Sequence, residues 1–394
     1  MKCEEKLKDV RKITLNETSL QDDIRNLMDS YNNWGELLDA APLAIGILGK
    51  LIVMSHQKMS FHSFFIPFPS SRSFFISPKK FTYPKSFRNS LLQITRKGNL
   101  VFLKAHDLIK RIQVYNSNLS MSSPIKDLSR LLVSRSEFSK FTSNYWSSLK
   151  GMYWSSLKGN FESLPLHRSK TPSAEVVKEF QMVLGLIEEM IVTAKQLELR
   201  RRNRQQVVMD KVVERNESFE INNIYNMEAI KALQNALNDL TVLKSAWMKL
   251  IEFYNKMSVL MSKSTVESKE FVDALQKNNG QLEDEKIFTT LMGKVQMANE
   301  TAFLVHEVSH MYVDISEMYI VDQMAHLDQM MNATEVDMDK LQLELTWSAE
   351  SDAEGIRHFI KADETLLRDK LADRYNQIVN EYRWMQDCDS EEDP

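Results

Sequence analysis

The chain has 394 residues, which is enough to bury a large core and allows roughly two or three domains of ordinary size. Its 50 Lys and Arg against 54 Asp and Glu leave a formal net charge of −4, which excludes the bulk positive charge of a general nucleic-acid-binding protein. The two cysteines, Cys3 and Cys388, stand at opposite ends, so the sequence offers neither a disulfide framework nor a cysteine-based zinc site.

Positive charge is unevenly distributed along the chain. No Asp or Glu occurs between Ala40 and His106, and the ten basic residues of that stretch leave −14 on the remainder of the chain. The basic residues are Lys50, Lys58, Arg72, Lys79, Lys80, Lys85, Arg88, Arg96, Lys97 and Lys104.

The first 36 residues predict a charged amphipathic helix. Apolar side chains recur in it at helical spacing: Ile24, Leu27, Met28, Tyr31 and Trp34. The N-terminus, MKCEEKLKDVRK, lacks the apolar core of a secretory signal, so we expect a cytoplasmic or peripheral membrane protein.

Residues 1–54 form the first expected segment, and its second part, APLAIGILGKLIVM, is apolar apart from Lys50. Its uncharged part is about ten residues, whereas a membrane-spanning helix needs about 20, so a single crossing is not expected. Two interpretations stay open: a helix or strand buried in the core, and a membrane-seeking hairpin held against the bundle until it meets a bilayer. The side chains that would enter lipid are Leu43, Ile45, Ile47, Leu48, Leu51 and Ile52.

Residues 55–90 are rich in Ser, Phe and Pro and follow neither a helical nor a strand period. A continuous helix is excluded by Pro67, Pro69, Pro78 and Pro84. One interpretation is a basic aromatic loop for an anionic membrane surface. A second is an insertion that never packs, such as non-coding sequence carried into the chain, and a third is an organelle transit peptide if translation starts at Met54 or Met59.

Residues 91–171 combine a helical segment with a linker. Apolar residues return at helical spacing from Leu91 to about Arg135, and two copies of YWSSLKG follow at 145–151 and 153–159. Because the period of the copies is far below the about 20 residues of a structural repeat unit, we interpret them as a recent duplication in a loop.

Residues 172–385 carry the strongest domain signal, because no proline occurs between Pro172 and Pro394. The run Asn226–Ser262 predicts one long amphipathic helix around which the other helices are organised. Steps of three and four residues from Ile230 collect an apolar stripe on it. The side chains expected to pack there are Leu233, Leu237, Leu240, Trp247, Ile251 and Tyr254.

Other long helices flank the central one. Thr171 as N-cap and Pro172 in the first turn start a helix that is expected to end near Asn216. Ser264 and Glu267 match a capping box, which predicts the start of a short separate helix.

The C-terminal part predicts two more helices, from Asp284 to Met331 and from Asn332 to about Met385, followed by an acidic, disordered tail at 386–394. The predicted fold class is therefore all-α: an elongated antiparallel bundle of long, coiled-coil-like helices with a disordered or poorly packed insertion.

One chemical motif occurs, on a predicted helix. Residues 306–310, HEVSH, match H-E-x-x-H, in which two imidazoles one turn apart hold zinc and the glutamate activates water. Glu317, Glu335 or Glu344 would be the third ligand of a metallopeptidase. The longer metzincin form is absent, because Val313 and Ser316 stand where it needs Gly and His.

Helical geometry argues against a zinc site at this motif. The apolar stripe of the helix consists of Leu304, Val308, Met311, Ile315 and Met318. With Leu304 at heptad position d, His306 falls at f and His310 at c, so both should face solvent rather than a closed site. We therefore expect surface histidines, no metal, no cofactor and no catalytic activity.

The layout of a charged helix, a short apolar stretch with glycine, and long proline-free helices resembles the α-helical pore-forming toxins of the haemolysin BL, Nhe and cytolysin A group, and eukaryotic proteins that share their bundle. The residues that carry it are Ala40–Met54 and the cluster Trp247, Leu250, Ile251, Phe253 and Tyr254. The resemblance covers 1–54 and 172–385, and it implies a soluble elongated bundle that exposes an apolar tongue and oligomerises in a bilayer.

Together these patterns predict a membrane-interacting, non-enzymatic helical protein with membrane lipids as partners and self-association through its helices. The alternative is a coiled-coil scaffold or interaction protein without a membrane role. A zinc metallopeptidase acting through HEVSH is a third, less favoured hypothesis.

Overall fold

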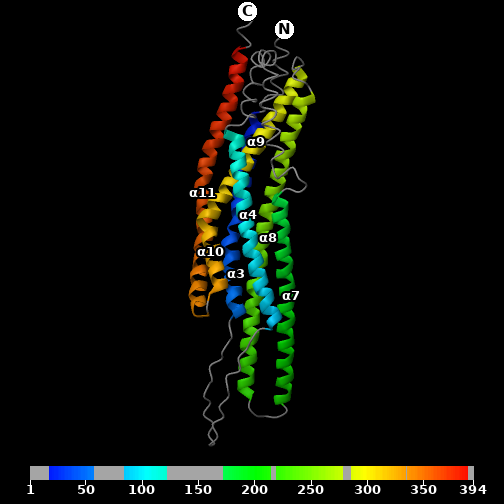
Figure 1. The fold of residues 1–394 in the computed structure, drawn as a ribbon, viewed down its shortest axis with the longest axis vertical. Coiled ribbons are helices and arrows are strands. Elements are labelled where there is room, and N and C mark those ends of the chain that lie inside the picture. The colour runs from blue at the N-terminus through cyan, green and yellow to red at the C-terminus, as the bar shows by residue number, and fades with distance from the viewer. Residues whose placement is uncertain are drawn as a thin grey trace, which may run out of the picture.

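The computed structural model describes residues 17–56, 84–121, 172–213, 219–277, 285–333 and 335–388. These ranges form an elongated all-α bundle without a strand in them, which confirms the predicted fold class (Figure 1). In chain order the elements are α2 (Glu17–Leu38), α3 (Ala40–His56), α4 (Lys85–Met121), α7 (Pro172–Val213), α8 (Phe219–Lys277), α9 (Glu285–Ile315), the π-helical turn η2 (Ser316–Ile320), α10 (Val321–Asn332) and α11 (Glu335–Cys388).

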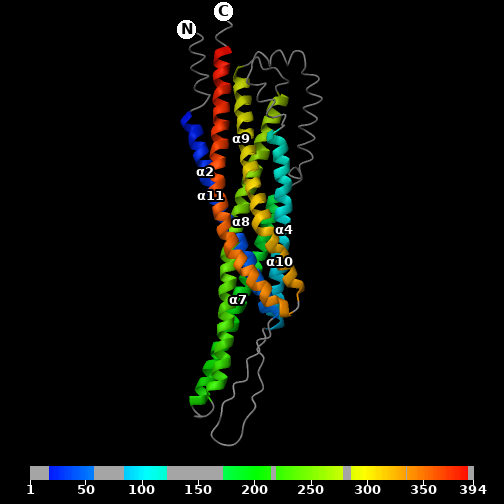
Figure 2. The same ribbon diagram turned by 90° about the vertical axis from the view of Figure 1, so that its left-hand side faces the viewer.

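The chain passes along the long axis of the bundle several times. In Figures 1 and 2, α2 and α3 run downward, α4 returns upward, α7 runs down and α8 runs up the whole length. The continuous path α9–η2–α10 then descends, and α11 ascends. Sequential helices are therefore mostly antiparallel neighbours, and the connections from α7 to α8, from α8 to α9 and from α10 to α11 are short, as is usual for such pairs.

A single residue, Asp39, separates α2 from α3. The backbone continues the helical path there, because the Asp39 N–H still donates to the Gly35 carbonyl at 3.2 Å. Pro42 follows in the first turn of α3, where its missing N–H is not needed by the helix.

The central helix α8 is longer than predicted, and the separate helix expected from the capping box at Ser264 and Glu267 was wrong. Glu267 is buried inside α8, where it accepts a hydrogen bond from the Thr301 hydroxyl of α9. Thr265 is also helical, and its hydroxyl donates to the Met261 carbonyl at 2.9 Å. The capping pattern arose because Glu267 has a partner on another helix, which the local sequence does not reveal.

The helix predicted from Asp284 to Met331 is found as α9, η2 and α10 in succession. The wider turn of η2 changes the helical register after Ile315, and α10 then packs against α3 and α11. The buried Ser316 hydroxyl lies 2.9 Å from Nδ1 of His106 on α4, which ties the turn to the neighbouring helix.

Two helix boundaries differ from expectation. α4 begins at Lys85, inside the segment 55–90 that was expected to lack order, and α11 continues to Cys388, past the expected start of the acidic tail. The YWSSLKG copies, most of residues 55–90 and the last residues of the chain lie outside the described ranges.

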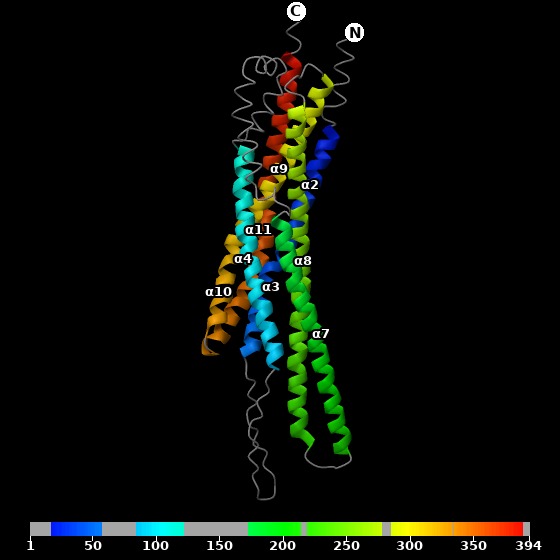
Figure 3. The ribbon, with the colours of Figure 1, turned by 45° about the vertical axis from the view of Figure 1, so that its right-hand side comes forward.

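The lower ends of α7 and α8 extend beyond the ends of α3, α4 and α10 (Figures 1 and 3). We call residues 199–213 of α7 and 219–233 of α8 the arm. Its base is marked by Gln234, whose side-chain amide donates to Glu198 at 2.9 Å. Above this level the helices surround a continuous apolar core.

Candidate functional site

The candidate membrane-active segment is α3, which lies inside the bundle with α4, α8, α10 and α11 packed around it. Five of the six side chains predicted to enter lipid are buried: Ile45, Ile47, Leu48, Leu51 and Ile52. The sixth, Leu43, is partly buried. A helix that is apolar on every side must be enclosed either by protein or by lipid, and here protein encloses it.

The one charge of α3 also has a neighbour. Lys50 is partly buried, and it lies close enough to Asp239 of α8 to lower the pKa of that carboxyl. Burial of Asp239 acts more strongly in the opposite direction, so its pKa is raised from the ordinary value. Lys50 therefore opposes part of the cost of burying this carboxylate.

Two glycines of α3 allow α11 to approach closely. A Cβ at Gly46 would lie 2.9 Å from the Cβ of Ala349, and a Cβ at Gly49 would overlap the side chain of Leu345. Without side chains at these positions the two backbones can come closer than larger residues would permit. Both glycines are thus part of a tightly packed helix interface.

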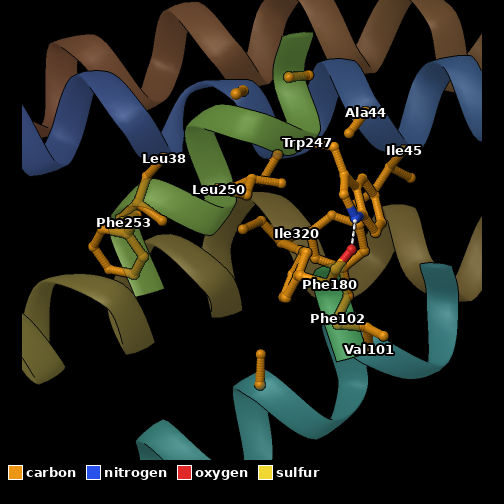
Figure 4. Close-up of a cluster of buried hydrophobic side chains, with 14 of the residues drawn as sticks. Leu38, Ala44, Ile45, Val101, Phe102, Phe180, Trp247, Leu250, Phe253 and Ile320 are labelled. Atoms are coloured by element: carbon orange, nitrogen blue, oxygen red, sulfur yellow. Dashed lines mark hydrogen bonds between the residues drawn. The ribbon is translucent and has the colours of Figure 1, made fainter. Parts of the chain in front are cut away.

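An aromatic cluster packs against α3 from α8, α4 and α7 (Figure 4). Trp247 is fully buried, and its indole Nε1 donates to the Phe180 carbonyl at 2.9 Å. The ring centroids of Phe102 and Phe180 lie 5.4 and 5.0 Å from that of Trp247, within the range of favourable aromatic contacts. Figure 4 places Ala44 and Ile45 beside the indole.

A hydroxyl pair continues this core toward α9. The Tyr254 hydroxyl donates to the Tyr312 hydroxyl at 2.7 Å, and both rings are buried. Burial raises the pKa of Tyr312 to about 12 and also raises the pKa of Tyr254, so both phenols stay neutral in the core.

The positions predicted to form helix-packing stripes line the same core. Buried among them are Leu233, Leu240, Trp247, Ile251, Tyr254, Val308, Met311 and Ile315. Leu237 and Leu304 are partly buried and pack against this core.

The HEVSH residues lie where α9 meets α2 and α11. Glu307 is buried, and Lys370 of α11 donates to its Oε2 at 3.1 Å. The His306 side chain is 16% exposed, and its Nε2 lies 3.9 Å from Oε1 of Glu307. His310 is more exposed, and its Nδ1 lies 2.8 Å from Oδ2 of Asp314.

The expectation that both histidines face solvent was wrong for His306. The heptad argument assumed that α9 has one buried face. In the structure α4 and α8 cover that face, and α2 and α11 cover a second one. Burial lowers the pKa of His306, and nearby His310 and Lys370 lower it further, while Glu307 acts in the opposite sense. Its Nδ1 has no hydrogen-bond partner in the part of the chain that the structure describes.

The arrangement around HEVSH differs from a zinc-peptidase centre. Glu307, the residue that would activate water, is instead paired with Lys370. Within the described ranges, no group of three or more His, Cys, Asp or Glu side chains is placed to hold a metal ion. The possible third ligand Glu317 is exposed and pairs with Lys110 of α4 at 2.6 Å.

We call Tyr31, His306, Glu307, His310, Asp314, Asp363 and Lys370 the polar cluster. The Tyr31 hydroxyl of α2 donates to Asp363 of α11. Burial first, and Asp363 second, raise the pKa of Tyr31. The cluster joins three helices through partners up to 332 positions apart, so no local pattern in the sequence could have found it.

A second polar tie was also missed. Asp39 is buried at the junction of α2 and α3, where Nε of Arg357 donates to its Oδ2 at 2.8 Å and Nζ of Lys249 lies 3.6 Å from its Oδ1. The only signal in the sequence was a carboxylate placed directly before an apolar run.

The stretch Met28–His56 is long and apolar enough to cross a membrane, by length and composition, and 78% of its most apolar part is buried inside the bundle. The core helix of a soluble protein has the same composition, so this property alone does not separate the two interpretations.

The chain matches no protein family, and no curated protein or solved structure is detectably similar to it.

Proposed function

We propose that the protein is a non-enzymatic, membrane-interacting helical bundle that stores α3 in its interior and transfers it to lipid. The observation that carries this proposal is the absence of acidic residues from the stretch that contains α3 and the first part of α4, as far as His106. No Asp or Glu occurs between Ala40 and His106, although carboxylates are frequent elsewhere. A core helix needs to be apolar, but packing alone does not require that the whole stretch of 67 positions from Ala40 to His106, most of it outside α3, avoid carboxylates.

Charge and polarity together fit an anionic bilayer surface. α3 would bring its apolar side chains into the hydrocarbon, while basic residues of α4 such as Arg96, Lys97 and Lys104 would meet lipid headgroups. Each basic residue near such a surface contributes about 1 kcal/mol of attraction, and a carboxylate would remove part of it.

A coiled-coil scaffold is the second candidate, and the interface of α3 with α11 favours it. Gly46 and Gly49 fit against Ala349 and Leu345, so the apolar character of α3 is used in the folded bundle. On this second hypothesis α3 never leaves its place, and the stripes of the outer helices bind other proteins.

Vesicle binding and dye leakage separate the two candidates. We would compare the wild-type chain with Leu345→Ala, using vesicles of phosphatidylcholine alone and of phosphatidylcholine with phosphatidylserine. Leu345→Ala leaves α3 unchanged but removes the side chain that covers Gly49, at a cost of about 2–5 kcal/mol in bundle stability. If α3 is transferred to lipid, loosening its cover should speed leakage from the anionic vesicles.

Ile360→Ala is the matched control, because Ile360 covers Gly35 of α2 rather than a residue of α3. It should destabilise the bundle by a similar amount and change leakage less. A third variant, Leu43→Asp, puts a carboxylate at a partly buried position of α3 and should reduce leakage while the fold is retained. The absence of binding to either vesicle by wild type and Leu345→Ala would reject the membrane proposal in favour of the scaffold.

A further inference from the structure

We propose that the soluble protein associates with further copies of itself, head to tail, through the arm of one molecule and the α10–α11 hairpin of the next. The two surfaces combine exposed apolar side chains with charges of opposite sign. The contact requires no lipid, so it can be tested independently of the membrane proposal.

The first surface lies on the arm and is basic. In the arm α7 carries four arginines, Arg200, Arg201, Arg202 and Arg204. The carboxylates at this end of the helix are Glu198 and Asp210. Glu198 is already paired with Arg202, one turn away on the same helix. The remaining charge at this end of α7 is therefore positive.

Apolar side chains accompany these charges. Leu199 is 59% exposed and Val207 is 52% exposed, although the neighbouring seam of the arm buries Ile230 and Leu233. Arg200, Arg204 and Val207 are separated by three or four residues and share one face of α7, with Leu199 beside them. This face therefore offers two aliphatic contacts flanked by two exposed guanidinium groups.

The second surface lies on the α10–α11 hairpin and is acidic. The carboxylates between positions 322 and 354 whose side chains the structure describes are Asp322, Asp328, Glu344, Glu350, Asp352 and Glu354. Lys340 is the one lysine or arginine in that interval.

An exposed aromatic residue stands in the middle of this acidic region. Trp347 is 74% exposed, and Leu343, one turn earlier on α11, is 58% exposed. Glu350 and Glu354 follow at helical spacing on the same face, and both are exposed. Tryptophan is enriched among the residues that dominate binding at protein–protein interfaces, and charged residues belong to the rim around such a centre.

The two surfaces lie apart within one molecule in all three ribbon views (Figures 1 to 3). The arm projects below one side of the bundle, and the α10–α11 end lies on another side. One copy cannot satisfy its own surfaces, so the contact joins different copies. An interface between two different patches of identical chains is heterologous, and it extends into a ring or an open chain.

Opposite charges favour this pairing over pairing of like surfaces. Two arms would bring arginines together, and two hairpins would bring carboxylates together, whereas an arm and a hairpin attract. Because these charges are exposed, added salt should screen the attraction.

Charge reversal tests the contact by sedimentation velocity in lipid-free buffer. The wild-type chain should show a mass above 45.9 kDa that rises with protein concentration in low salt and returns to the monomer value in high salt. Arg200→Glu with Arg204→Glu reverses the charges beside Leu199 and Val207 on the arm, and Glu350→Lys with Glu354→Lys reverses the charges beside Trp347 on the hairpin. Each double variant alone should associate at least about tenfold more weakly, because the side chains that border its two apolar contacts now carry charges of the same sign.

A mixture of the two double variants gives the decisive result. The two glutamates introduced on the arm of one variant then face the two lysines introduced on the hairpin of the other, and their native surfaces also match, so association should return only in the mixture. Lys178→Glu with Lys269→Glu is the control, since both lysines are exposed, lie outside the two surfaces and change the net charge as the arm variant does.

All reversed positions are exposed, so circular dichroism should show the wild-type helix content in every variant. A wild-type chain that stays at 45.9 kDa at every concentration and salt level overturns the proposal. So does a mixture that associates no better than its two components.

Discussion

α8 passes through two regions of the molecule that use the same helical period in different ways. In the arm, α8 buries Ala229, Ile230, Ala232 and Leu233, and α7 is the helix that runs beside it there (Figure 3). Higher in the bundle, Trp247, Phe253 and Tyr254 are all fully buried, and their rings contact Phe102 of α4, Phe180 of α7 and Tyr312 of α9. The apolar period alone therefore does not tell how many neighbours a helix has.

The same contrast separates α3 from α7. α3 is enclosed by four other helices, whereas the lower half of α7 leaves Leu199 and Val207 exposed. Enclosure makes each side chain of α3 dependent on the fit of its neighbours, because dense interiors tolerate neither voids nor overlap. Substitutions in the two regions should accordingly change the free energy of unfolding by different amounts and sometimes in opposite directions.

The largest effect is expected for Trp247→Ala, at the centre of the enclosed region. The change removes a fully buried indole and leaves the Phe180 carbonyl without its donor, so the free energy of unfolding should fall by about 3–5 kcal/mol. Urea denaturation followed by circular dichroism measures the loss. Met248→Ala, at the exposed neighbouring position, should change it by less than about 0.5 kcal/mol. Equal losses in the two variants would mean that α8 is not enclosed at this level.

Glycine-to-alanine changes sharpen the comparison, because one should lower the free energy of unfolding and the other should raise it. At Gly46 the new methyl group would meet the Cβ of Ala349 at 2.9 Å, and overpacking of this kind costs about 1–3 kcal/mol. At Gly185 of α7 nothing lies within 4 Å, and alanine should stabilise the helix by up to about 1 kcal/mol. Thermal melting of the two variants gives both signs in one experiment, and stabilisation at Gly46 would contradict the close approach of α3 and α11.

A smaller, pH-dependent effect is expected at the polar cluster. Burial lowers the pKa of His306, so the unfolded chain binds the proton more readily than the folded one. The free energy of unfolding should therefore fall as pH drops from neutrality through the ordinary histidine value of about 6.5 toward the lowered folded value. His306→Gln should flatten this part of the stability profile.

The groups facing His306 set the range in which this should be measured. Glu307, His310 and Lys370 surround it, and burial raises the pKa of Asp314, which gives the opposite pH dependence at more acidic values. Burial also lowers the pKa of His106 on α4, which acts in the same range, so the His306 contribution is the difference between the wild-type and His306→Gln profiles from pH 7 into the histidine range. His358→Gln, at an exposed position of α11, is the control and should leave the slope unchanged.

The smallest effect is expected for Leu199→Ser on the arm. The side chain is 59% exposed, so the free energy of unfolding of dilute, monomeric protein should change by less than about 0.5 kcal/mol. Chemical denaturation in high salt, where the proposed self-association is weak, is the suitable measurement. If the free energy of unfolding fell by about 2 kcal/mol or more, as it does when a buried side chain is truncated, Leu199 would have to be covered in the folded protein.

The sequence by itself determined the all-α class and the approximate course of most helices after Pro172, because side chains repeating every three to four residues can share a buried face only in a helix. Local signals also placed the start of α7 at Pro172 and of α11 near Glu335. They failed at Ser264, where the partner of Glu267 is Thr301 on another helix.

Only the tertiary structure decided which faces of these helices are covered. It enclosed α3 rather than leaving it on the surface, placed the side chain of His306 between helices, and paired Tyr31 with Asp363 and Glu307 with Lys370. The physical reason is that a helical period specifies one apolar face, whereas burial depends on every neighbour that the chain brings alongside from distant positions.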